Sequence, residues 1–417
     1  MRTALDYFLE LIYFETTSDE NSTTYPSSPG QIEILRHLVG LVEELGLETT
    51  LSDKYTLYGR LPANSPELAD LPPLGFIAHV DTSPAASGKV NSHRYVTYTG
   101  EPIVINADLN LTLSAALFPE LNKLVGHDLI IADGTSLLGA DNKAGVAEIL
   151  ALFAYLQANP QIKHGPLRLA FTPDEEIGAG TRYFDLELFD AAMAVTVDGG
   201  LSPEISCETF NAAGAVVTVR GRSVHPGTAY KQMVNAATLA ARFAASFDPL
   251  DTPEETRERQ GFLHCGNICG DVTTATLNYI IRDFDPDNFT ARKELMRRRV
   301  EEFNAKYART DIDAPPPFSV EIKDQYLNMR SYIEREPTIM NLLDKAFAAL
   351  GITQKLIPTR GGTDGARLSE MGLPCPNVFT GGGNFHGPYE YLSVQDMEQA
   401  VELLRQLVVA HANSVAL

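Results

Sequence analysis

The chain has 417 residues, 44% of them hydrophobic and 21% charged, which is typical of a folded protein with more than one domain. Its 54 acidic residues outnumber its 33 basic residues and leave a net charge of −21, which argues against nucleic acid or an anionic membrane as a partner. Residues 1–20 have helically spaced apolar side chains separated by acidic ones, so they predict an amphipathic helix and not a signal peptide. No apolar run approaches the length of a membrane span.

The first half of the chain alternates strand-like apolar runs with a helical pattern. Residues 74–80, 166–172 and 192–198 are predicted strands, and residues 141–157 have the apolar spacing of a helix. This alternation predicts a mainly parallel sheet with helices on both faces.

The pattern changes near residue 209, where a β-α-β-β-α-β order typical of a ferredoxin-like domain begins. The predicted strands are 213–221, a short one around 267–272, 274–284 and 317–324, and the predicted helices are 234–247 and 287–307. The α/β pattern then resumes with a helix at 339–351, a strand at 376–380 and a helix at 394–411. We therefore predict a domain of residues 209–321 inserted into an α/β domain made of residues 1–208 and 322–417.

The four cysteines are few for the length of the chain. Cys265 and Cys269 have a Cys-x3-Cys spacing, but without a second pair this is a weak zinc signal. Reduced thiols in a cytosolic protein are the expectation.

Acidic and imidazole side chains follow five of the predicted segments. In open α/β sheets, sites form beyond the carboxyl ends of the strands. Each residue alone could be a helix cap, a turn residue or part of a solvated loop. Together these explanations fail, because several carboxylates buried at one edge would be very costly without cations. The residues are His79, Asp81, Asp141, Glu175, Glu176, Asp198 and His386.

Two divalent metal ions would compensate this charge. Imidazole and carboxylate ligands suit Zn²⁺, with Co²⁺ or Mn²⁺ as alternatives. One terminal histidine and one terminal carboxylate for each ion, with a third carboxylate bridging, would form a neutral core once a hydroxide is bound. One of Glu175 and Glu176 would then be a ligand and the other a general base, since adjacent side chains on an extended chain face opposite ways. Asp81, two residues after His79, can orient that imidazole.

The motifs around these residues resemble those of the cocatalytic zinc peptidases, the family of peptidase T, a tripeptide aminopeptidase, and of the carboxypeptidase G2-like enzymes. They occur in family order from about residue 75 to 390. They are HVDTSP, LLGADNKAG, FTPDEEIG, TVDGG, VHPGTA, YIIRDFD, NMR, RGGTDGA, MGLPCPN and FTGGGNFHG.

The resemblance implies a role for each residue of the strand-end group. Asp141 matches the bridging ligand, Glu175 the general base and Asp81 the residue that orients a histidine. Many relatives have a second aspartate after the bridging one, where this chain has Asn142. The bridging position is retained, so we take this difference as tolerable. The implied metal ligands are His79, Asp141, Glu176, Asp198 and His386.

The resemblance also implies a lid or dimerisation role for the inserted domain. His225 matches a lid histidine that stabilises the oxyanion, and Asn328, Arg330 and Arg360 match motifs that hold the C-terminal carboxylate of the substrate. Arg282 is a further candidate for substrate contact. Without the resemblance, His225 would be a helix-start residue, Arg360 a surface residue of a tight turn, and Arg282 a partner in a strand-edge salt bridge.

We therefore predict a cytoplasmic dizinc aminopeptidase that releases the N-terminal residue of tripeptides. A hydroxide bridging the metals would attack, with Glu175 as general base and acid. The small peptide is the predicted partner, together with a second copy of the chain bound through the inserted domain. A carboxypeptidase, dipeptidase or N-deacylase on the same scaffold is the alternative enzyme. A catalytically silent binding module would be expected to have lost Glu175 or a ligand, and none is lost.

Overall fold

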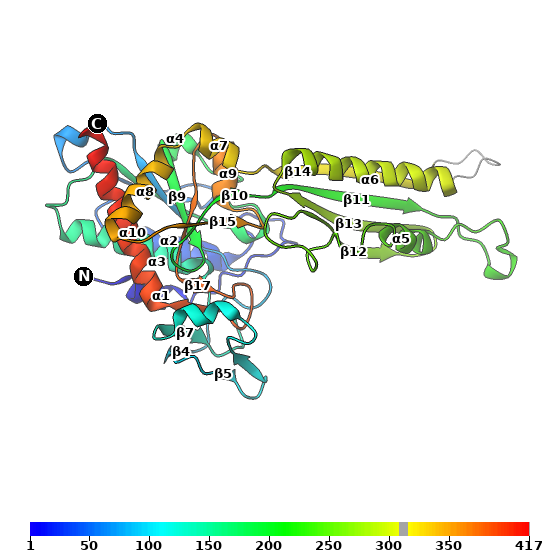
Figure 1. Cartoon of the computed structure of the whole chain (residues 1–417), viewed down its shortest axis with the longest axis horizontal. Coiled ribbons are helices and arrows are strands. Elements are labelled where there is room, and N and C mark those ends of the chain that lie inside the picture. Colours follow the sequence, from blue (N-terminus) through cyan, green and yellow to red (C-terminus); the bar gives the residue numbers. More distant parts are fainter. Residues whose placement is uncertain (308–315, 417) are drawn as a thin grey trace. The chain divides into compact units, whose positions relative to one another are not determined.

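The structure is a computed structural model that describes residues 1–307 and 316–416. The described chain divides into two compact units, which are labelled in Figure 1 by their helices and strands. The first unit contains Met1–Cys207, Met329–Ile357 and Thr363–Leu417, and the second contains Glu208–Asn328 and Pro358–Gly362. The second unit thus includes residues 322–328 and 358–362, which the sequence analysis had assigned to the catalytic domain. Residues 308–315 of the predicted insert lie outside the described residues.

The first unit is built on an eight-stranded mixed sheet. Its central strands β8, β3, β9 and β16 are parallel, whereas β1, β2 and β10 pair with their neighbours in antiparallel fashion. Every residue of β3 and β8 is buried, because helices cover both faces of the sheet. This confirms the predicted mainly parallel sheet. The order of strands is β1 (Glu48–Leu51), β2 (Leu57–Leu61), β8 (Leu167–Thr172), β3 (Leu74–His79), β9 (Met193–Gly199), β16 (Asn377–Phe379), β10 (Glu204–Thr209) and β15 (Lys355–Thr359).

Side chains of the central strands alternate between two layers of helices. Phe76 of β3 packs in the core formed with α1, α2, α3, α8 and α10, whereas Ile77 packs with residues of α4 and α9 on the other face. The helices are α1 (Ala4–Leu11), α2 (Pro29–Glu44), α3 (Ala140–Ala158), α8 (Thr338–Leu350), α10 (Val394–Ala412), α4 (Leu186–Phe189) and α9 (Asp364–Glu370).

Helix α3 lies unusually close to strand β9. A Cβ added to Gly145 would lie 1.9 Å from the carbonyl oxygen of Val197, so only glycine allows this approach. The start of α3 is thereby brought beside the carboxyl end of β9.

A smaller antiparallel sheet in the first unit was not predicted, because its strands are short and separated in sequence. Its order is β17 (Gly382–Gly383), β18 (Tyr391–Ser393), β7 (Asp128–Ala132) and β4 (His93–Thr97). Strand β18 pairs with β7, which places the segment after His386 beside the segment that leads to Asp141. The remaining elements of this unit are β5 (Ile103–Asn106), β6 (Leu111–Leu113), α7 (Arg330–Arg335), η1 (Pro66–Leu68), η2 (Pro119–Leu124), η3 (Glu175–Ile177) and η5 (Asn413–Ala416).

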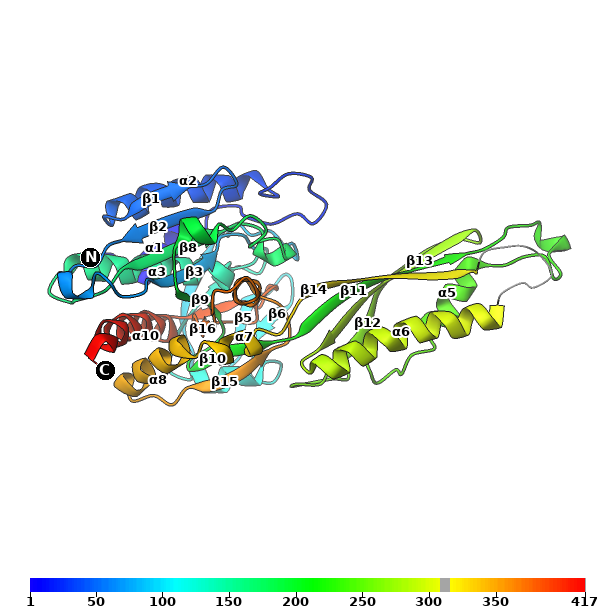
Figure 2. The ribbon, with the colours of Figure 1, turned by 90° about the horizontal axis from the view of Figure 1, so that it is seen from above.

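The second unit is a four-stranded antiparallel sheet with two helices packed on it (Figure 2). Its elements follow the predicted β-α-β-β-α-β order. The strand predicted around 267–272 begins earlier, at Phe262. Its start was missed in the sequence because a register irregularity between Cys265 and Asn267 interrupts the alternation of its side chains. In chain order the elements are β11 (Asn211–Arg220), η4 (Pro226–Thr228), α5 (Ala236–Ala244), β12 (Phe262–Gly270), β13 (Thr274–Asp283), α6 (Pro286–Tyr307) and β14 (Phe318–Tyr326). The sheet order is β12-β13-β11-β14.

Among the described residues, no helix combines the length and the apolar character needed to cross a membrane.

Candidate metal centre

The parallel strands of the first unit deliver the strand-end side chains to one edge of the sheet. His79 ends β3, Asp198 lies near the end of β9, and the glutamate pair forms η3 directly after β8. Asp141 lies in the first turn of α3, and His386 in the loop between β17 and β18. Parallel strands end at the same edge, so residues far apart in the sequence meet there.

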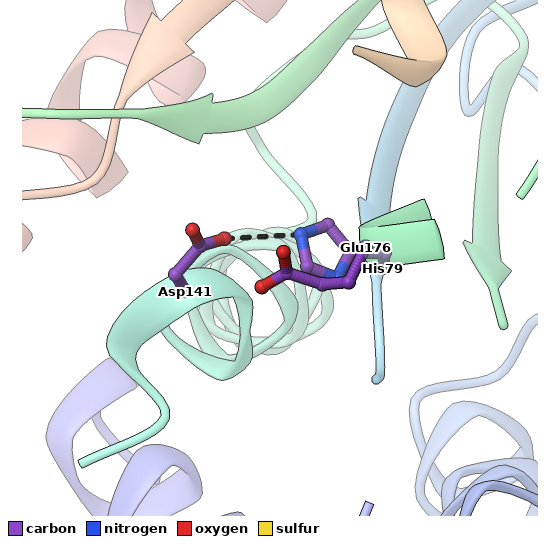
Figure 3. A group of neighbouring side chains, drawn as sticks. All are labelled: His79, Asp141 and Glu176. Carbon is purple, nitrogen blue, oxygen red and sulfur yellow. Dashed lines mark hydrogen bonds and ion pairs between the residues drawn. The ribbon is translucent and has the colours of Figure 1, made fainter. Parts of the chain in front are cut away.

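The carboxylate of Asp141 lies between two imidazoles. Its Oδ1 is 3.0 Å from Nε2 of His79, the pair joined by a dashed line in Figure 3, and its Oδ2 is 3.1 Å from Nε2 of His386. One carboxylate therefore presents one oxygen to each histidine, which is the arrangement that a bridging ligand requires.

Each histidine also faces a second carboxylate. Asp198 Oδ1 is 3.5 Å from Nε2 of His79, and Glu176 Oε2 is 2.9 Å from Nε2 of His386. The structure thus brings together two groups, each with one histidine and one carboxylate of its own, around the shared Asp141. The neighbouring Glu175 lies on the His79 side, with its Oε2 4.0 Å from Nε2.

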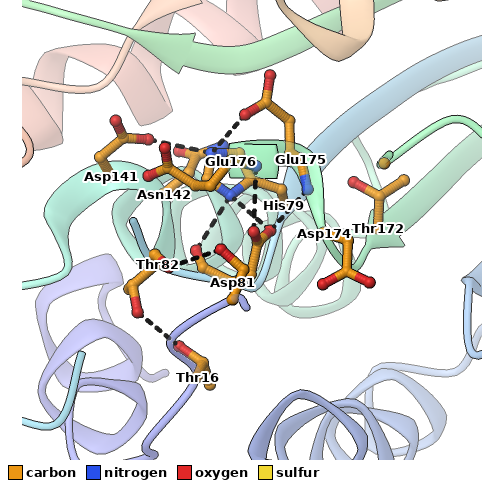
Figure 4. Close-up of polar contacts among 12 residues, drawn as sticks. Thr16, His79, Asp81, Thr82, Asp141, Asn142, Thr172, Asp174, Glu175 and Glu176 are labelled. Atoms are coloured by element: carbon orange, nitrogen blue, oxygen red, sulfur yellow. Dashed lines mark hydrogen bonds and ion pairs between the residues drawn. The ribbon is translucent and has the colours of Figure 1, made fainter. Parts of the chain in front are cut away.

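Asp81 is fully buried and connects His79 with the glutamate pair (Figure 4). Its Oδ1 lies 3.2 Å from Nδ1 of His79. Its two oxygens also accept hydrogen bonds from the backbone N–H groups of Glu175 and Glu176, at 3.0 and 3.1 Å. One carboxylate therefore orients the imidazole and holds the main chain of both glutamates.

Burial and contacts with the two imidazoles shift the pKa values of the acidic side chains of this cluster in opposite directions. Burial raises the pKa of Asp198 to about 6 and that of Glu176 to about 7, and it raises the pKa of Glu175 well above its usual value. Burial acts in the same direction on Asp141, but its hydrogen bonds with His386 and His79 outweigh burial and hold the pKa of Asp141 below its usual range.

The pKa values of both imidazoles are raised above the usual value. Hydrogen bonds with Asp141 and Glu176 raise the pKa of His386 to about 11. Burial lowers the pKa of His79, but the charge of Asp198 and the hydrogen bond with Asp141 overcome it and leave the pKa well above the usual value. The raised pKa values of His79 and His386 thus favour protonated imidazoles, whose charge would compensate the carboxylates.

The residues present fit metal ions in place of those protons. His79, Asp141 and Glu176 offer ligand atoms that all lie within 4.8 Å of one another. Oε1 of Glu176 is buried and has no hydrogen-bond partner among the described residues. Imidazole and carboxylate donors together suit Zn²⁺ or a similar divalent ion.

A cavity of about 440 Å³ adjoins Glu176. Its walls come from η3, from the segment after it, and from the loop 19–27. Asp174 holds this loop, since its carboxylate accepts hydrogen bonds from the backbone N–H of Ser27 and from Nε2 of Gln31, both at 2.7 Å. The loop is therefore part of the surroundings of the metal centre.

Two of the predicted substrate residues, His225 and Arg282, lie in the second unit. His225 is the N-cap of η4, where its Nδ1 accepts a hydrogen bond from the N–H of Gly227 at 3.1 Å. The guanidinium of Arg282 donates to the carbonyl oxygens of Ala213 and Ile281, at 3.1 and 3.0 Å, and lies over the ring of Tyr326. These contacts all lie within the second unit, and they neither support nor contradict the predicted substrate roles.

Asn328 and Arg360 also lie in the second unit, whereas Arg330 belongs to the first. Arg360 had been predicted in the catalytic domain with its charge directed to substrate. It lies in the second unit, and its guanidinium donates to the carbonyl oxygens of Gln260 and Glu258, at 2.7 and 2.9 Å. Arg330 is exposed and pairs with Glu334 at 2.7 Å. The side chain of Asn328 bridges two chain segments, accepting from the N–H of Thr209 and donating to the carbonyl oxygen of Phe284.

Three buried acids near the cluster escaped the sequence analysis: Asp174, Asp364 and Glu390. Asp364 accepts a hydrogen bond from the hydroxyl of Thr172 at 2.7 Å, and burial raises its pKa to about 7. None of these acids ends a predicted strand, and an acid in a loop is usually solvated. Asp174, directly before the glutamate pair, and Asp364, in the motif RGGTDGA, carried a signal that the sequence analysis could have used.

The sequence and the fold are both similar to those of known proteins. Residues 127–410 match the model of peptidase family M20/M25/M40. Peptidase T of Bacillus licheniformis is 47% identical over 94% of this chain and 95% of its own length. Peptidase T of Bacillus subtilis is 46% identical over 97% of both chains.

Solved structures with the same fold include the aminopeptidase PepT of Bacillus cereus, with a TM-score of 0.74, 20% identity and 98% of both chains covered. The YXEP protein of Bacillus subtilis, described as a dinuclear metal-binding peptidase of the M20 family, has a TM-score of 0.63 and 15% identity and covers 97% of this chain and 96% of its own. These two likenesses show the fold, and the sequence matches show the family. The chain belongs to peptidase family M20/M25/M40, a family of metallo-exopeptidases, and within it to the peptidase T group.

Proposed function

We propose that this chain is a dizinc aminopeptidase that releases the N-terminal residue of tripeptides. The observation that carries the proposal is the division of the ligand set, in which Asp141 faces both His79 and His386 and each histidine has a carboxylate of its own. The peptidase T relatives support the substrate class.

The proposed ligands divide into two sets with one shared member. His79 and Asp198 would hold one ion, His386 and Glu176 would hold the other, and Asp141 would bind both. Bound divalent ions polarise a scissile carbonyl and lower the pKa of a water molecule, the chemistry that peptide hydrolysis needs.

Glu175 would move the proton in this reaction. Its carboxylate lies beside the His79 group without being the nearest acid to either imidazole. Burial raises its pKa well above the usual value, which suits a group that takes a proton from water and later delivers it to the leaving amine.

The remaining assignments concern substrate binding. We propose that His225 contributes to stabilising the oxyanion and that Arg330 contacts the substrate carboxylate, with Asn328 and Arg282 as further candidates. For Arg360, such a role would require exchange of its hydrogen bonds to the carbonyl oxygens of residues 258 and 260.

We also propose that the second unit mediates a homodimer and that the protein works in the cytoplasm. The thiols of Cys265, Cys269 and Cys375 are free, which suits a reducing compartment.

The proposal is tested by adding zinc-loaded protein to di-, tri- and tetrapeptides and measuring the amino acids released. We expect release of the N-terminal residue with a preference for the tripeptide, and none from an N-acetylated tripeptide. Release of the C-terminal residue, or activity on the acetylated peptide alone, would contradict it. The Glu175→Gln variant identifies any contaminating peptidase.

A further inference from the structure

Glu390 is a buried acid that is not one of the proposed metal ligands, yet it connects the segments of two of them, His386 and Asp141. It follows His386 by four residues and directly precedes β18. Only 3% of its surface is exposed. A carboxylate is costly to bury, so its hydrogen-bond partners are informative.

Among the described residues, the hydrogen-bond partners of this carboxylate are backbone N–H groups of the loop that carries Asp141. Oε2 of Glu390 accepts from the N–H groups of Leu138 and Gly139, at 2.7 and 2.9 Å. Oε1 accepts from the N–H of Asp141 itself, at 3.1 Å. These N–H groups precede the regular part of helix α3, since Asp141 and Asn142 have non-helical backbone angles, and no carbonyl of the helix can accept from them.

The backbone conformation of residues 138–141 directs these N–H groups toward the carboxylate of Glu390. Gly139 has a φ of +76°, in the left-handed region that favours glycine, and the chain turns there into α3. The carboxylate of Glu390 thus acts on the start of α3 as a cap supplied from a distant segment.

We infer that Glu390 is a positioning residue that sets the zinc affinity of the centre by holding the main chain of Asp141 against the segment of His386. This inference rests on the proposed metal site. A bridging carboxylate works only if both oxygens keep their directions, and those directions depend on the main chain beneath them. An ion held by Asp141, Glu176 and His386 would depend on Glu390 most, since the segments of two of these ligands meet at this residue.

The test is a zinc titration of the purified chain against a fluorescent chelator, with Glu390→Gln as the variant. An amide has one acceptor oxygen and turns an NH₂ group toward a backbone donor, so the variant cannot reproduce all three hydrogen bonds. We expect zinc affinity at one or both positions to fall about 10- to 100-fold, as for other residues that hold metal ligands in place.

The matched control is Glu148→Gln. Glu148 is also a fully buried glutamate, on α3 itself, but its carboxylate has no hydrogen-bond partner among the described residues. Its zinc affinity should equal that of the wild type. An equal loss of zinc in both variants would overturn the inference, since any change of a buried glutamate would then suffice.

Unchanged zinc affinity in Glu390→Gln, with a wild type that binds two ions, would overturn this inference alone. A wild type that binds no zinc would overturn the metal site as well. Should Glu390→Gln fail to fold, Glu390→Asp decides by the same titration, because it keeps the charge and shortens the reach by one methylene. Wild-type affinity in Glu390→Asp would then overturn the inference.

Discussion

Asp81 contacts His79 on the ring edge opposite to the proposed metal position. Oδ1 of Asp81 is 3.2 Å from Nδ1, whereas Nε2 of the same ring faces Asp141 at 3.0 Å. The backbone carbonyl oxygen of Asp81 also lies 3.1 Å from Nδ1. A proton held on Nδ1 by these two oxygens leaves the lone pair of Nε2 available for a metal ion.

The first prediction concerns this pair. Asp81→Asn should lower zinc affinity and turnover about 10- to 100-fold, because the amide loses the negative charge beside Nδ1 of His79. It also loses one of the acceptors for the N–H groups of Glu175 and Glu176. Zinc titration and turnover at saturating zinc check this, and a variant that matches the wild type in both would contradict it.

The glutamate pair should separate into two roles. Glu175→Gln should keep both metals and the fold but reduce turnover by about 10²- to 10⁴-fold, the range typical of general acid–base groups. Glu176→Gln should instead lose zinc, because its carboxylate faces His386. Metal content and turnover are measured on both variants, and equal metal loss in the two would show that the roles are misassigned.

The His225→Ala variant tests whether the second unit takes part in catalysis. It is exposed and its recorded contacts are local, so His225→Ala should leave metal content and thermal stability nearly unchanged. If the imidazole stabilises the oxyanion, turnover should fall while zinc affinity does not. Unchanged turnover would leave His225 as the cap of η4 alone.

Arg360 has two competing explanations. Its hydrogen bonds to two carbonyl oxygens predict that Arg360→Ala destabilises the second unit, by roughly 1.5–3 kcal/mol for bonds from a charged donor. A role in substrate binding predicts, in addition, a loss of about ten- to a hundredfold in kcat/KM for a free tripeptide.

A comparison of wild type and variant on free and C-terminally amidated tripeptides separates the two. A carboxylate anchor makes the amidated peptide a poor wild-type substrate that loses little further activity in the variant. Equal losses for both peptides, together with a lower unfolding midpoint, would leave Arg360 a structural residue.

The burial of Glu148 leads us to expect that the free energy of unfolding depends on pH. Burial raises its pKa well above the usual value, so the folded chain holds a proton there that the unfolded chain releases above about pH 4.5. Its contribution to stability is therefore present at low pH and falls as the pH rises toward the folded pKa.

Glutamine does not titrate, so Glu148→Gln lacks this fall. Relative to the wild type, its stability should increase by up to about 1.4 kcal/mol per pH unit above about pH 4.5. Urea unfolding of both proteins between about pH 5 and pH 7 measures the difference. A difference that does not change with pH would show that Glu148 is not protonated in the fold.

The core of the fold could be predicted because its signals are local. The apolar runs of β3, β8 and β9 and the helical spacing of α3 are each contained in one short segment. Their alternation determines a mainly parallel sheet, and a parallel sheet brings the ends of its strands to one edge. The expectation that His79, Asp141 and Asp198 meet therefore followed from the sequence, and the structure brings them together.

Only the tertiary structure decided which groups the other acids face. Glu390 binds the main chain of a loop about 250 residues earlier. No periodicity in the sequence around Glu390 indicates this partner. The partners of Arg360 likewise come from a loop about 100 residues away. A carboxylate or guanidinium looks the same in sequence whether it meets solvent, a metal ion, a substrate or backbone groups, because its partner is set by long-range packing and not by its neighbours in the chain.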